Sequence, residues 1–102
     1  MLYANGNSKS SVVVASDAPV FIHTLATSSP YSKVKDYTIA QWESFSREVN
    51  AEQISFSASD KTPRRFNITL GGTDGVQQGE CYVVIAHYAD DTVLMSEVMQ
   101  MQ

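Results

Sequence analysis

The chain has 102 residues, of which 43% are hydrophobic and 18% charged, and its formal net charge is −4. This length and composition predict one globular domain with its own core and argue against a disordered chain. The acidic balance argues against nucleic acid as a partner, because phosphate binding needs clustered Lys and Arg. The one basic cluster, Lys61-Thr62-Pro63-Arg64-Arg65, is typical of a solvated loop.

Cys81 is the only cysteine, which excludes an intrachain disulfide and a CxxC metal site. The first residues, MLYANGNSKSS, lack the basic and apolar regions of a signal peptide. No apolar run approaches the ~20 residues of a membrane helix. We therefore expect a soluble protein without membrane insertion. The compartment stays open, since a reducing one is compatible with the single cysteine, and among the alternatives we favour an extracellular or virion location.

Residues 1–11 are small and polar and are expected to form a flexible arm before a single β-rich domain, 12–102. Val12–Ala15 is a short β-branched run that indicates a strand. Val20–Ala26 indicates a second strand with two largely apolar faces, which predicts cover on both sides of a sheet.

A change of period marks the middle of the chain. Ile39, Trp42, Phe45 and Val49 recur at spacings of three, three and four, which predicts a helix over 38–49 with its apolar side on a sheet. Thr38 and Gln41 match a capping box, and Asn50 is a plausible end. Residues 31–37 are expected to be an irregular connector.

Residues 54–59 and 65–70 alternate between apolar and polar side chains, which is typical of half-buried antiparallel strands joined by a hairpin loop. The glycine-rich segment 71–79 is interpreted as a β connection. A phosphate cradle of this kind would lead into a helix, whereas the segment leads into another apolar run.

The most hydrophobic part of the chain is its end, 80–101. Cys81–Tyr88 has two apolar faces and is expected to be the central strand, and 89–92 is expected to be a turn. The last strand is expected to place Val93, Met95, Met99 and Met101 on one face. Because methionine surfaces are adaptable and an unpaired strand can pair with another chain, Met95, Met99 and Met101 are the predicted partner-binding residues, for a protein partner or a second copy.

The segment from Leu70 to Tyr88, a loop with glycines that leads through Gly79-Glu80-Cys81-Tyr82 into a long strand, resembles the late hairpin of fibronectin-III-like and immunoglobulin-like modules. This resemblance implies a mainly β, antiparallel β-sandwich of immunoglobulin-like kind with one short helix. The alternative is an α+β fold with a single antiparallel sheet and one packed helix.

Tyr88-Ala89-Asp90-Asp91 resembles the YxDD hairpin of reverse transcriptases, whose carboxylates hold Mg²⁺, and Gly75-Val76-Gln77-Gln78-Gly79 resembles an element that precedes it in that family. The spacing between the two elements is too short, and the family's further metal-binding Asp has no equivalent. We therefore interpret Asp90-Asp91 as turn residues. With Asp74 they remain weak candidates for a metal site.

No grouping of catalytic residues stands out, and no cofactor is expected. Cys81 and His87 lie too far apart on one strand to form a dyad, and His23 is interpreted as a core or half-buried histidine. We expect a non-enzymatic structural or protein-interaction module, part of a virion, appendage or cell-surface assembly. The alternatives are a ligand- or carbohydrate-binding module that stacks its ligand on Tyr31, Tyr37, Trp42 or Tyr88, and a metal-dependent enzyme around Asp90-Asp91.

Overall fold

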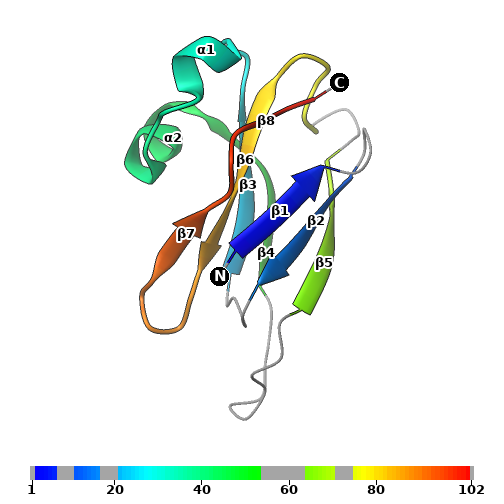
Figure 1. The fold of residues 1–102 in the computed structure, drawn as a ribbon, viewed down its shortest axis with the longest axis vertical. Helices are drawn as coiled ribbons and strands as arrows, with labels where there is room; N and C mark the ends of the chain where they lie inside the picture. The colour runs from blue at the N-terminus through cyan, green and yellow to red at the C-terminus, as the bar shows by residue number, and fades with distance from the viewer. Residues whose placement is uncertain (1, 7–10, 17–20, 54–63, 71–74, 102) are drawn as a thin grey trace.

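The computed structural model describes residues 2–6, 11–16, 21–53, 64–70 and 75–101 (Figure 1). In chain order its elements are β1 (Leu2–Gly6), β2 (Ser11–Ser16), β3 (Phe21–Thr27), α1 (Tyr31–Val34), α2 (Ile39–Phe45), β4 (Arg47–Gln53), β5 (Arg64–Thr69), β6 (Cys81–His87), β7 (Val93–Met95) and β8 (Met99–Gln100).

The strands form two antiparallel sheets. The smaller sheet has the order β1-β2-β5, and the larger has the order β4-β3-β6-β7, with β8 also paired to β6. Figure 1 shows the smaller sheet and the two helices on different sides of the central strands β3 and β6. The expectation of a mainly antiparallel β-fold is confirmed, and the helices packed beside a sheet also fit the α+β alternative.

The centre of the larger sheet is buried on both faces, as the two apolar faces of β3 and β6 predict. One face packs against β5, and its cluster includes Ile22, Val84 and Ile68. The other face packs against the helices, and its cluster includes Val83, Ile85, Val34 and Trp42. β3 and β6 thus separate two apolar cores, because successive side chains of a strand point to opposite faces.

Helix α2 begins as the sequence predicts but ends earlier. The Thr38 hydroxyl accepts a hydrogen bond from the Gln41 amide (3.2 Å), and the Gln41 side chain accepts one from the Thr38 amide (2.9 Å), so the capping box is confirmed. The prediction of helix up to Val49 is wrong, because Ser46 is extended (ψ 168°) and β4 follows. Pairing with β3 overrides the helical pattern there, and Val49 packs in the β5-facing cluster, away from Trp42.

Two segments expected to be irregular carry regular structure. Within 31–37, the four-residue helix α1 forms on the Pro30 carbonyl, which accepts hydrogen bonds from the Lys33 and Val34 amides. Val34 is fully buried, so one apolar residue anchors a helix too short to show a period. Within 1–11, residues 2–6 form β1, which pairs with β2 and corrects the expectation of an arm.

The predicted turn at the end of β6 is confirmed. Tyr88 and Thr92 close it with a backbone hydrogen bond (2.8 Å), and Asp91 takes a positive φ of 69° that Asp tolerates in turns. The Asp90 carboxylate accepts a hydrogen bond from the Thr92 amide (3.0 Å).

The last strand is divided, which corrects the expectation of one methionine face. Val84 and Ser96 are joined through backbone and side chain: the Ser96 amide donates to the Val84 carbonyl, and the Ser96 hydroxyl accepts from the Val84 amide (both 2.9 Å). Between β7 and β8, successive side chains no longer alternate between the two faces of the sheet. Met95 packs against the helix-facing cluster, whereas Met99 and Met101 belong to the β5-facing cluster.

Among the strands expected from alternation, 65–70 is confirmed as β5, whose described partner is β2. The expected strand 54–59 and its hairpin loop lie outside the described residues.

Candidate functional site

The principal polar group within the larger sheet is a pair of histidines on its helix-facing side. Phe21 of β3 pairs with His87 of β6 and His23 pairs with Ile85, so the two histidines are diagonal neighbours on one face. Their Nε2 atoms lie 3.3 Å apart. The ring of Phe21 stands against both imidazoles, at centroid distances of 5.3 and 5.8 Å.

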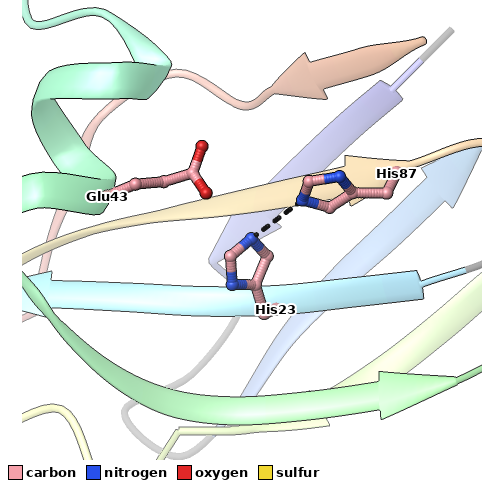
Figure 2. A group of neighbouring side chains, drawn as sticks. All are labelled: His23, Glu43 and His87. Atoms are coloured by element: carbon pink, nitrogen blue, oxygen red, sulfur yellow. Dashed lines mark hydrogen bonds between the residues drawn. The ribbon is translucent and has the colours of Figure 1, made fainter. Parts of the chain in front are cut away.

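Two carboxylates from other elements approach this pair. Figure 2 shows the side chain of Glu43 extending from α2 towards both imidazoles. One ligand atom each of His23, Glu43 and His87 lies within 4.8 Å of the other two. Glu48 of β4 places a carboxylate oxygen 3.4 Å from Nδ1 of His23, on the side of the ring away from His87. His23 is buried, His87 is half-buried, and Glu43 is exposed.

This arrangement could not be found by spacing in the sequence. His23 and His87 are 64 positions apart, and Glu43 comes from a third element. Only the register of β3 on β6 brings the histidines together. The one signal in the sequence is that each histidine occurs in an apolar strand that is otherwise without charge, and burial of a polar ring asks for a partner.

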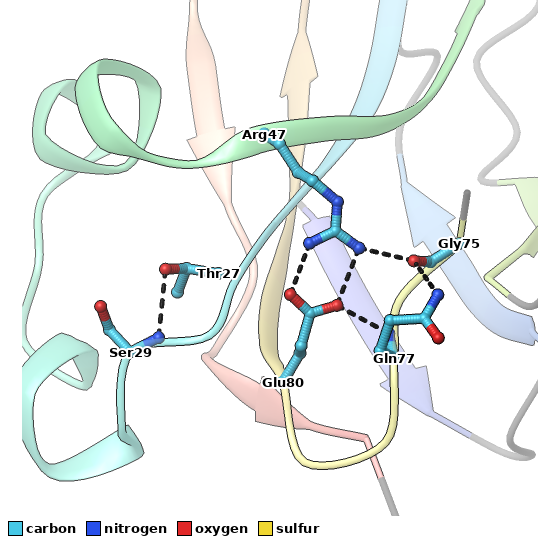
Figure 3. A network of polar contacts seen from close by, with 6 residues as sticks. All are labelled: Thr27, Ser29, Arg47, Gly75, Gln77 and Glu80. Atoms are coloured by element: carbon cyan, nitrogen blue, oxygen red, sulfur yellow. Dashed lines mark hydrogen bonds and ion pairs between the residues drawn. The ribbon is translucent and has the colours of Figure 1, made fainter. Parts of the chain in front are cut away.

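A second polar cluster holds the start of β4 against the loop before β6 (Figure 3). The Arg47 guanidinium donates to both carboxylate oxygens of Glu80 and to the Gly75 carbonyl (2.6 Å), and the Gln77 amide donates to Glu80 (2.7 Å). The hydrogen bond from Arg47 is the main reason that the pKa of Glu80 lies below its ordinary value. These hydrogen bonds satisfy the buried carboxylate of Glu80, and we interpret the cluster as structural.

The predicted metal candidates are not brought together by the described part of the chain. Asp90 and Asp91 are exposed in the turn, and hydrogen bonds from Thr92 lower the pKa of Asp90. Asp74 lies outside the described residues. The group of three potential ligands that the described residues do form is the histidine group, which contains neither Asp90 nor Asp91.

The predicted stacking residues are corrected in one case. Trp42 of α2 is 0% exposed and packs in the helix-facing cluster, so its ring is not available to a ligand at the surface. Tyr88 is half-buried against the β5-facing cluster. Among the residues whose side chains the structure describes, the exposed aromatic residues are Tyr31 (47%), a predicted stacking residue, and Phe45 (40%), and Tyr37 packs edge-on against Phe45. Cys81 is buried and its pKa is raised by desolvation, as expected of an unreactive thiol.

The predicted partner-binding strand lies at one edge of the larger sheet. Within the described residues, β7 and β8 pair with β6 on one side only. Met95 and Met99 are half-buried, and Met101 is buried at 6% exposure. The methionine side chains thus serve mainly the two cores, and the edge itself offers backbone groups.

Comparison with known proteins gives no relative: no family model, no curated protein and no solved structure matches this chain. Among the described residues, no helix has the length and apolar character needed to cross a membrane.

Proposed function

We propose that this chain is a non-enzymatic structural or protein-interaction module with an immunoglobulin-like sandwich fold. The order of its first seven strands supports this fold. β1-β2-β5 corresponds to strands A, B and E, and β4-β3-β6-β7 corresponds to C′, C, F and G of that architecture. Ile68 of β5 shares a core with Ile22 and Val84 of the larger sheet, as two packed sheets require.

Two departures distinguish the chain from antibody domains. The single cysteine leaves no inter-sheet disulfide, and the only Trp lies on a helix rather than on the third strand. The helices α1 and α2 between β3 and β4 bury this Trp instead. A function cannot be inferred from such a fold alone, so the proposal depends on a surface feature.

The observation that carries the proposal is the C-terminal edge of the larger sheet. Thr92 and Ser96 direct backbone groups to β6, since the Thr92 carbonyl accepts from Tyr88 and the Ser96 amide donates to Val84. Because alternate residues of a strand face alternate sides, Val93 and Met95 direct their amides and carbonyls away from β6. This edge can accept an extended strand of a partner protein or of a second copy, as expected in a virion, appendage or cell-surface assembly.

Substitution of Met95 tests this mode of binding. Met95→Pro removes an outward amide, whereas Met95→Ala removes nearly the same side-chain packing and keeps the amide. We expect wild type and Met95→Ala to form oligomers or cross-linked complexes, measured by light scattering and by cross-linking with mass spectrometry, and Met95→Pro to lose them. A strictly monomeric wild type without a cross-linked partner would overturn the proposal, and so would equal binding by both variants.

The two alternative functions have less support. A carbohydrate-binding site lacks its main stacking residue because Trp42 is buried. A metal-dependent enzyme around Asp90-Asp91 has little basis, since the Asp90 carboxylate stabilises the turn through the Thr92 amide.

A further inference from the structure

The histidine group on the helix-facing side does not supply the outward backbone groups of the proposed binding edge, and its geometry calls for another explanation. The Nε2 atoms of His23 and His87 are 3.3 Å apart. Two imidazole nitrogens that bind one tetrahedral Zn²⁺ at about 2.0–2.1 Å lie about 3.3–3.4 Å from each other. The two strands therefore already hold these nitrogens at the separation of ligands on one metal ion.

The surroundings of His23 favour the tautomer that a metal ligand needs. Its Nδ1 is buried and has no aligned hydrogen bond, while the Glu48 carboxylate is 3.4 Å away. A carboxylate at this distance stabilises a proton on Nδ1, and the lone pair then lies on Nε2, towards His87. Histidine ligands of metals typically donate the other ring N–H to a carboxylate in this way.

Glu43 completes the group from above the sheet. Its carboxylate comes within 4.8 Å of both histidine ligand atoms, and it projects from α2 into the space beside them (Figure 2). We propose that His23, His87 and Glu43 bind a divalent transition-metal ion of the zinc class and thereby tie α2 to the larger sheet. This site is independent of the proposed interaction at the C-terminal edge.

The donor set indicates which ions bind. Two imidazoles and one carboxylate suit Zn²⁺, Co²⁺, Ni²⁺ or Cu²⁺, whereas Mg²⁺ and Ca²⁺ prefer sites made of oxygen ligands. Three protein ligands leave one tetrahedral position for water or for a group of a bound molecule. The ring of Phe21 stands against both histidines, and an apolar group at this place limits the access of solvent to the proposed site.

A simple hydrogen bond between the two imidazoles is the competing explanation, because one ring can donate Nε2–H to the other. This bond needs only His23 and His87, so it gives Glu43 no role. Dependence on Glu43 therefore separates the two explanations. The residue is exposed, and its replacement by Gln keeps its size and leaves the packing of α2 unchanged.

The experiment uses tag-free protein treated with a chelator, because a polyhistidine tag would bind the same ions. Zn²⁺ is titrated by calorimetry, Co²⁺ by visible absorption, and Mg²⁺ and Ca²⁺ serve as comparison ions. The variants are Glu43→Gln and His87→Gln for the ligands and Glu48→Gln for the supporting carboxylate. Glu52→Gln is the matched control, since Glu52 is an exposed glutamate of β4 that pairs with Ile22 and not with His23.

We expect wild type and Glu52→Gln to bind one Zn²⁺ or Co²⁺ ion and to ignore Mg²⁺ and Ca²⁺. Glu48→Gln should weaken binding about 10- to 100-fold, and Glu43→Gln and His87→Gln at least about 100-fold. At a zinc concentration of 100 times Kd, Tm of the wild type should rise by about 10–20 °C. The proposal is overturned if the wild type binds no Zn²⁺ or if Glu43→Gln binds Zn²⁺ as tightly as the wild type. If His87→Gln fails to fold, the affinity of Glu43→Gln still distinguishes a metal site from a simple hydrogen bond.

Discussion

At the scale of single residues, the buried carboxylate of Glu80 shows how one side chain can join two distant segments. Glu80 is 8% exposed and accepts hydrogen bonds from Arg47 at the start of β4 and from the Gln77 amide of the loop before β6. A charge so buried is costly unless it is paired, and here a guanidinium and a backbone amide pair it. The contacts position β4, whose residue Glu48 supports His23.

This pairing predicts a dependence of stability on pH. The folded pKa of Glu80 lies below its ordinary value of 4.5, so its contribution is present above that value and is lost as pH falls through the folded pKa. Glu80→Gln should lower the free energy of unfolding at pH 7 by about 1–3 kcal/mol. Urea titration should show this difference shrinking below pH 4.5. The exposed residue Glu97 gives the control Glu97→Gln; a loss independent of pH, or the same loss in the control, would contradict the assignment.

At the scale of elements, α2 is a seven-residue helix that depends on its ends and on one anchor. Helices of this length are unstable in isolation, so the capping box and the burial of Trp42 must hold it. The Thr38 hydroxyl caps the N-terminus of α2, and the helix positions Glu43 beside the histidine pair.

Loss of the cap should therefore be measurable. Thr38→Ala leaves the Gln41 amide without its acceptor and should lower the free energy of unfolding by about 1 kcal/mol, measured by urea denaturation. Thr38→Ser keeps the hydroxyl, so its decrease in the free energy of unfolding should be at most about half of the decrease in Thr38→Ala. Equal losses in both variants would mean that the methyl group of Thr38, rather than the cap, is what stabilises the helix.

The sequence predicts those elements whose local pattern agrees with their final environment. The doubly apolar strands around Ile22 and Val84, the capping box at Thr38 and the turn at Asp90 are of this kind. The end of α2 is not, because Arg47–Gln53 has a composition suited to a helix and becomes a strand only by pairing with β3. The meeting of His23 and His87 likewise depends on strand register, which no local pattern encodes.

At the scale of the whole molecule, the two cores share the strands β3 and β6. In β6, three alternate side chains serve the β5-facing cluster (Tyr82, Val84 and Ala86), and three serve the helix-facing cluster with Trp42 (Cys81, Val83 and Ile85). A loss of packing on one face therefore destabilises β3 and β6, which the core on the other face also needs. Small domains with this kind of coupling unfold in a single transition.

Ile68 and Trp42 allow this coupling to be measured, because Ile68 lies in β5 and the only Trp of the chain lies on the opposite side of the larger sheet. Ile68→Ala creates a cavity among buried side chains and should cost about 2–5 kcal/mol. If β3 and β6 transmit that loss, the midpoint of urea unfolding followed by Trp42 fluorescence should fall as far as the midpoint followed by far-ultraviolet circular dichroism. A fluorescence midpoint that stays at the wild-type value would mean that the helix-facing core unfolds independently of the smaller sheet.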